Sequence, residues 1–265
     1  MSSSTPVVFI HGLWIHSTAW QPWQDLFREA GYEASAPGWP GDLPSVQATR
    51  HNADALAGVG IDDITAAYRS FIAGLPSKPI VIGHSFGGLI AQKLLASGDA
   101  IAAIAIDPGQ IKGVKPVPFA QIRSGLPVLK SPANRKKAVS LTAKQFRYGF
   151  GNAISQTESD RLHAAWTIPG PGRPLFEAST ANFNTTSPAA VDTKKSDRGP
   201  LLFIAGGKDH TVPEVVVKAA YKLYAESTAV TDLRVFPDRG HSLVFDSGWR
   251  AVANASLAWL KSQSL

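Results

Sequence analysis

The chain has 265 residues, of which 44% are hydrophobic and 17% are charged, and it contains no cysteine. This composition excludes intrinsic disorder, disulfide bonds, thiol catalysis and cysteine metal sites. The net charge is +6. The basic residues are scattered, with small clusters at 135–137 and 194–195, and are not interleaved with aromatic residues, so we expect no nucleic-acid binding. No run approaches the ~18 apolar residues of a membrane span, and the first residues lack a signal-peptide pattern. We therefore expect no membrane association and a cytoplasmic location.

Five mainly apolar runs and one short segment at 32–36 predict β-strands, because each is bounded by a turn or loop signal. The predicted strands cover residues 7–10, 32–36, 79–82, 101–106, 201–205 and 233–236. Helical patterns separate most of them, which indicates parallel βαβ units. The sequence therefore predicts an α/β fold with about six mostly parallel strands flanked by helices.

The connecting segments show helical spacing of apolar side chains. The predicted helices cover about 20–30, 62–75, the segment after residue 85, 213–225 and 247–261. Ser17 or Thr18 can cap the first helix, and Gly31 ends it. Residues 42–60 are polar and irregular and predict a loop.

Residues 109–198 break the alternation of strands and helices. They contain many prolines, no convincing strand and two capping-box patterns that begin at Thr142 and Ser155. We interpret 109–198 as a helical lid inserted into a core formed by 1–108 and 199–265. Repeated aromatic residues suggest that the lid packs its own small core.

The stretch Gly83-His84-Ser85-Phe86-Gly87 lies between a predicted buried strand and a predicted helix. A G-x-S-x-G motif in this position is typical of a nucleophile elbow, a sharp turn that lifts the serine hydroxyl above the strand ends. The following helix directs its N-terminal N–H groups toward the place where an oxyanion would form.

A serine hydroxyl needs a histidine to accept its proton and a carboxylate to orient that histidine. Asp209 and His241 are the candidates, because each follows a later predicted strand. Asp107, after the strand at 101–106, is the alternative acid, whereas Asp238 is too near His241 in sequence to be favoured.

The order Ser85…Asp209…His241, with His11-Gly12 after the first strand, resembles the α/β-hydrolase superfamily over essentially the whole chain. The resemblance implies an oxyanion hole formed by the backbone N–H groups of Leu13 and Phe86. The two strands that usually open the sheet of that family are missing here, as in compact members such as plant methylesterases.

The remaining candidate residues have weaker support. Trp14, Trp166 and Phe183 are candidate substrate contacts. His11 is expected to orient its loop, and His84 to point away from the site. The spacing of His, Asp and Glu residues indicates no metal, and we expect no cofactor.

The predicted function is a serine hydrolase that cleaves an ester, lactone or thioester of a small to medium apolar substrate through an acyl-enzyme. A cofactor-free haloperoxidase or perhydrolase, an oxygenase, and a non-catalytic small-ligand receptor remain alternatives on the same fold. A hydroxynitrile lyase of this superfamily would be expected to carry threonine in place of Gly12 and lysine in place of Ser242. Both positions differ here, so the sequence disfavours that activity. The sequence does not indicate an oligomeric state.

Overall fold

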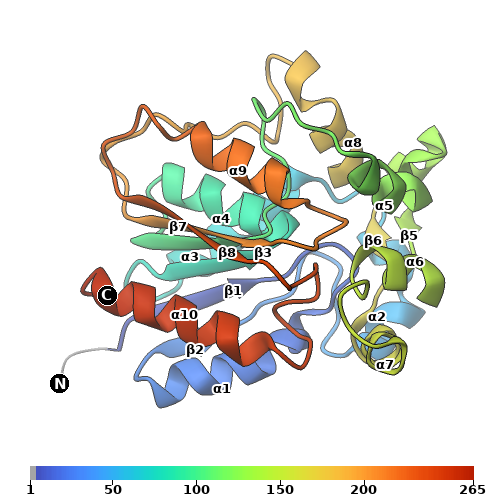
Figure 1. Cartoon of the computed structure of the whole chain (residues 1–265), viewed down its shortest axis with the longest axis horizontal. Coiled ribbons are helices and arrows are strands. Elements are labelled where there is room, and N and C mark those ends of the chain that lie inside the picture. The colour runs from blue at the N-terminus through green and yellow to red at the C-terminus, as the bar shows by residue number, and fades with distance from the viewer. Residues whose placement is uncertain (1–3) are drawn as a thin grey trace.

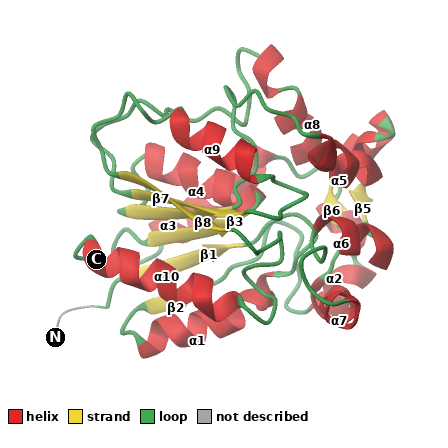
Figure 2. Cartoon of the chain, viewed as in Figure 1, coloured by secondary structure: helices red, strands yellow, loops and turns green. Residues whose placement is uncertain are grey.

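The computed structural model describes residues 4–265 and contains one sheet of six parallel strands (Figures 1 and 2). The strand order is β2-β1-β3-β4-β7-β8. The strands are β1 (Pro6–Ile10), β2 (Glu33–Ser35), β3 (Ile80–His84), β4 (Ala102–Ile106), β7 (Leu201–Gly206) and β8 (Thr231–Phe236). The predicted α/β fold with six parallel strands is confirmed.

Helices cover both faces of this sheet, so its central strands are buried on both sides. Figure 1 shows α1 and α10 on one face and α4 and α9 on the other. The helices of the core are α1 (Gln21–Glu29), α3 (Ile61–Ala73), α4 (Phe86–Ala96), α9 (Glu214–Lys222) and α10 (Trp249–Ser262). Every residue of β1, β3, β4 and β7 is buried, which explains why these strands are continuous apolar runs.

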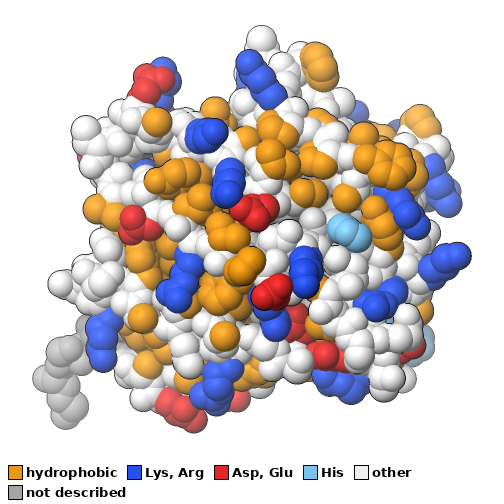
Figure 3. All heavy atoms as spheres, in the orientation of Figure 1, with side chains coloured by type: hydrophobic (Ala, Val, Ile, Leu, Met, Phe, Trp, Pro, Cys, Tyr) orange, Lys and Arg blue, Asp and Glu red, His pale blue; other side chains and the backbone are white. Residues whose placement is uncertain are grey.

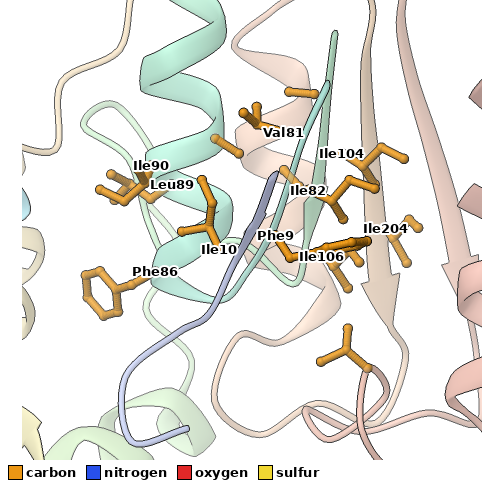
Figure 4. Close-up of a cluster of buried hydrophobic side chains, with 14 of the residues drawn as sticks. Phe9, Ile10, Val81, Ile82, Phe86, Leu89, Ile90, Ile104, Ile106 and Ile204 are labelled. Carbon is orange, nitrogen blue, oxygen red and sulfur yellow. The ribbon is translucent and has the colours of Figure 1, made fainter. Parts of the chain in front are cut away.

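The core beside the predicted elbow joins the strands to α4. Figure 4 shows Ile10, Ile82 and Ile104 of adjacent strands together with Leu89 and Ile90 of α4. All five side chains are fully buried. Such dense apolar packing on both sides of β3 fixes the end of the strand from which the elbow begins.

Two predictions for the early chain were wrong. His16, and not Ser17 or Thr18, caps the first helical turn, because its side chain accepts the Thr18 N–H at the start of a 3₁₀ turn, η1 (Ser17–Trp20). Residues 42–60 are also not simply irregular, because they contain α2 (Val46–His51) and η2 (Ala53–Leu56). The Ser45 side chain caps α2 by accepting the Ala48 N–H.

Most of residues 109–198 lies beyond one end of the sheet, on the right in Figure 2. Their helical segments are α5 (Phe119–Leu129), η3 (Pro132–Lys136), α6 (Ala143–Gly149), α7 (Gln156–Trp166), α8 (Arg173–Ser179) and η4 (Ala181–Phe183). Two short strands that the sequence did not predict, β5 (Ala138–Val139) and β6 (Gly170–Pro171), pair antiparallel. The predicted capping box of Thr142 and Gln145 is formed at the start of α6. Within the described residues, no helix combines the length and apolar character needed to cross a membrane.

Candidate active site

Ser85 lies on a strained turn between β3 and α4. Its φ of 56° and ψ of −124° are unfavourable for a residue with a side chain. A Cβ on Gly83 would collide with the backbone of Gly87, and a Cβ on Gly87 would collide with the carbonyl group of Ile10. The two glycines therefore allow the chain to turn tightly enough to place Ser85 above the strand ends.

Asp209 and His241 are in direct contact on loops that follow β7 and β8. Asp209 Oδ2 lies 2.5 Å from His241 Nδ1. The other carboxylate oxygen accepts the N–H groups of Thr211 at 2.6 Å and Val212 at 2.8 Å. These bonds fix the carboxylate, and the carboxylate in turn selects the imidazole tautomer with its proton on Nδ1.

The other nitrogen of this imidazole is free to act as a base. His241 is fully buried, and its Nε2 atom is buried without a hydrogen-bond partner among the described residues. Phe150 lies edge-on to the ring with centroids 4.7 Å apart. No hydrogen bond joins Nε2 to Ser85 Oγ in this structure. Such bonds are often formed only when a substrate is bound.

A second carboxyl group lies next to Asp209. Asp107 is fully buried at the end of β4, and its Oδ1 accepts the Gly206 N–H at 2.7 Å. Its Oδ2 is buried without a partner in the described structure. Burial raises the pKa of the Asp107 carboxyl well above its usual value, and the adjacent Asp209 raises this pKa further. Asp107 therefore keeps its proton at pH values where an exposed carboxyl group has lost it.

His84 does not point away from the site as expected. Its ring lies 4.5 Å from the His241 ring, because the end of β3 packs beside the loop that carries His241. Burial lowers the pKa of His84 well below its usual value, and His241 lowers this pKa further. His84 is therefore a neutral neighbour of His241.

One group of side chains has the spacing to hold a cation: the ligand atoms of His84, Asp107 and His241 lie within 4.8 Å of one another. The spacing of these residues along the sequence did not indicate this group, because they come together only in the folded chain.

The loop after β1 packs directly onto Ser85. A Cβ on Gly12 would lie 2.6 Å from Ser85 Cβ, so only glycine allows this approach. Leu13 follows Gly12 in this loop, and Phe86 is the first residue of α4. Neither backbone N–H has an acceptor among the described residues. Both are therefore available to an oxyanion beside Ser85.

His11 holds the same loop in place. Its Nε2 lies 2.9 Å from Asp42 Oδ2, and its ring stacks on Trp39 with centroids 4.8 Å apart. This geometry agrees with the structural role expected from the sequence.

A cavity of about 280 Å³ opens above Ser85, and Leu13 and Phe86 also line it. Its wall is mostly apolar and includes side chains such as Leu129, Leu175 and Val212. Trp14 and Phe183, two of the candidate substrate contacts, line the cavity. Trp166, the third, is not among the lining residues and packs against the hydrophobic core.

Sequence reasoning missed several cavity residues. Gly109, Gln110 and Ser124 line the cavity, although they belong to no recognisable motif. Ser124 donates to or accepts from Thr211 at 2.8 Å, which links α5 to the loop of Asp209. Only the folded arrangement of 109–198 over the strand ends reveals these residues.

Solved structures with the same fold include several enzymes. A methylesterase from Arabidopsis matches with a TM-score of 0.68 and 19% identity, covering 97% of this chain and 99% of its own. A monoacylglycerol lipase from Paleococcus ferrophilus matches with a TM-score of 0.65 and 22% identity, covering 98% of this chain and 96% of its own. A putative non-heme bromoperoxidase from Mycobacterium tuberculosis has a TM-score of 0.71 and 20% identity, covering 98% of this chain and 93% of its own.

At the level of sequence, no curated protein matches the chain. The family described as "Alpha/beta hydrolase family" matches residues 7–255. This match spans the sheet from Val7 onward, the elbow and the loops of Asp209 and His241. The chain belongs to the alpha/beta hydrolase family.

Proposed function

We propose that this protein is a serine hydrolase that cleaves a carboxylic ester, lactone or thioester through an acyl-enzyme. One observation carries the proposal: the Asp209–His241 pair leaves Nε2 unpaired, and the His241 ring lies 4.5 Å from the ring of His84, the residue directly before a strained serine that lines an apolar cavity. A serine in an ordinary turn would need neither the backbone strain nor a buried histidine–carboxylate pair.

The proposed reaction begins when Ser85 Oγ attacks the substrate carbonyl carbon and His241 Nε2 accepts the hydroxyl proton. Asp209 stabilises the imidazolium that forms, through its contact with Nδ1. The N–H groups of Leu13 and Phe86 stabilise the oxyanion. The carbon–oxygen bond to the leaving alcohol then breaks, and the alcohol takes the proton from Nε2. Water, activated by His241, releases the acid and restores Ser85.

The size and lining of the cavity favour a small to medium apolar substrate. A volume of about 280 Å³ is near the lower end of ligand pockets, and the wall is mostly apolar. We also propose that 109–198 serves as a lid, since α5 and α8 supply much of this wall.

The test is turnover of a p-nitrophenyl ester series, from acetate to long acyl chains, by wild type and Ser85→Ala. Ser124→Ala is a matched control, because Ser124 is another buried cavity serine that has no histidine partner. Ser85→Ala should lose on the order of 10⁴-fold in kcat, whereas Ser124→Ala should keep most of its activity. Comparable activity of wild type and Ser85→Ala would reject the mechanism.

A perhydrolase is the second candidate, favoured by the fold shared with the putative bromoperoxidase. The two activities share the acyl-enzyme and differ in whether water or hydrogen peroxide attacks it. Peracid formation from an acyl ester and hydrogen peroxide, compared with ester hydrolysis at equal enzyme concentration, distinguishes them. Folded wild type without any turnover would instead favour a receptor.

A further inference from the structure

Basic residues occur along the whole chain, but the excess of positive over negative charge comes from one segment. Residues 108–157 contain nine Lys and Arg residues and no Asp or Glu. The other 215 residues contain 17 Lys and Arg against 20 Asp and Glu, and therefore carry a net charge of −3. The nine basic residues are Lys112, Lys115, Arg123, Lys130, Arg135, Lys136, Lys137, Lys144 and Arg147. None of them forms an ion pair among the described residues.

The same part of the molecule exposes large apolar side chains. We call five of them the lid patch: Val117, Phe119, Ile122, Leu126 and Phe183. Phe183 is 91% exposed and Phe119 is 76% exposed, which is unusual for phenylalanine in water.

The lid patch is continuous with the mouth of the cavity. Val117, Ile122 and Phe183 line the cavity as well as being exposed. Phe119, Ile122 and Leu126 follow helical spacing, so they share one face of α5. In Figure 3, hydrophobic and basic side chains lie together at the upper right, over this end of the molecule.

We propose that the lid patch and the surrounding basic residues dock the protein onto an anionic lipid surface, so that an amphiphilic substrate enters the cavity from that surface. Apolar side chains at the contact insert among lipid chains, while Lys and Arg attract anionic headgroups. A second copy of this chain is a poorer occupant, because two such basic segments would repel each other.

This surface contact needs no spanning helix and revises the expectation of no membrane association. The proposal extends the proposed function, but binding to vesicles is measurable without turnover. Vesicle binding is therefore measured with every variant in the Ser85→Ala background. Loss of docking then appears in the binding assay, and loss of hydrolysis appears only in the separate turnover assay of the wild-type chain.

The experiment is cosedimentation of the full chain with phosphatidylcholine vesicles that contain or lack phosphatidylserine. Binding should be at least tenfold tighter with phosphatidylserine and should weaken with added salt. The pair Phe119→Ser and Phe183→Ser should reduce binding at least tenfold. Phe71→Ser, at an exposed phenylalanine of α3, is the control and should leave binding unchanged.

A separate variant tests the charge. Lys136→Gln with Lys137→Gln should weaken binding to phosphatidylserine vesicles and reduce its salt dependence. Absence of binding, or equal binding to both vesicle types, would overturn the proposal. It would also be overturned if the chain formed dimers in buffer that the Phe119 and Phe183 substitutions dissociated, because the patch would then be a self-interface.

Discussion

Replacing Asp107 with asparagine should change how stability depends on pH. Burial and the adjacent Asp209 raise the pKa of Asp107, so the native state keeps a proton that the unfolded chain loses near pH 4. The native state therefore binds one proton more than the unfolded state over this range. Its free energy of unfolding falls as pH rises, until Asp107 titrates in the native state.

The magnitude follows from a difference of one proton. It amounts to about 1.4 kcal/mol of unfolding free energy per pH unit. Asp107→Asn has no proton to lose, so its stability relative to wild type should rise with pH by up to that slope. Between pH 5 and pH 7 the relative gain has an upper limit of about 3 kcal/mol.

Urea unfolding of wild type and Asp107→Asn at several pH values measures this slope. Asp238→Asn is the matched control for the substitution, because the Asp238 side chain is 85% exposed. A stability difference that stays flat with pH would refute the reasoning. A difference that falls as pH rises would show instead that the native state favours the charged form of Asp107.

The enzymatic pH profile provides an independent readout of the same charge state. A second negative charge at the site would shift the acid limb of kcat/KM to higher pH. Since Asp107 is neutral in our account, Asp107→Asn should leave this limb in place. A shift of the limb to lower pH would mean that the substitution had removed a negative charge.

Three further predictions concern the elbow, the acid and the cavity. Gly87→Ala should lower the free energy of unfolding by about 3 kcal/mol in urea, because its Cβ would collide with the carbonyl groups of Ile10 and His11 at the end of β1. Gly74→Ala, where an added Cβ has room, should change it by less than about 0.5 kcal/mol. Asp209→Asn should reduce kcat by about 10⁴-fold without unfolding the protein, since His241 loses the group that orients it; near-normal turnover would exclude Asp209 as the acid. Gly125→Leu should fill the cavity beside α5 and reduce kcat/KM for long-chain esters at least tenfold relative to acetate; an unchanged chain-length profile would place the acyl chain elsewhere.

The sheet could be predicted from sequence because its strands are buried on both faces. Such strands are continuous apolar runs, and a run like Ile80–Ile82 has no other simple interpretation when a turn motif follows it. The order of Ser85, Asp209 and His241 was also predictable, since each follows a strand and parallel strands end at one edge of the sheet. Their roles in the reaction remain predictions.

Features that depend on packing between distant segments could not be predicted. The pairing of Asp107 with Asp209 and the stacking of His84 near His241 arise from loops that meet only in the folded chain. The lid patch was hidden for the same reason: Phe119 and Phe183 are 64 positions apart in sequence, and only the fold shows that both are exposed. The capping of η1 by the His16 side chain was also not predicted, because the residues that usually cap helices are serine, threonine, aspartate and asparagine.

The most direct test of the central claim is to trap the acyl group on Ser85. Wild type is mixed with a p-nitrophenyl ester, quenched rapidly in acid and digested for peptide mass analysis. The account predicts a burst of p-nitrophenolate that matches the enzyme concentration, together with an acyl adduct on the peptide containing Ser85, and neither in Ser85→Ala. Turnover without an adduct at Ser85, or an adduct at another residue that accounts for the burst, would contradict it.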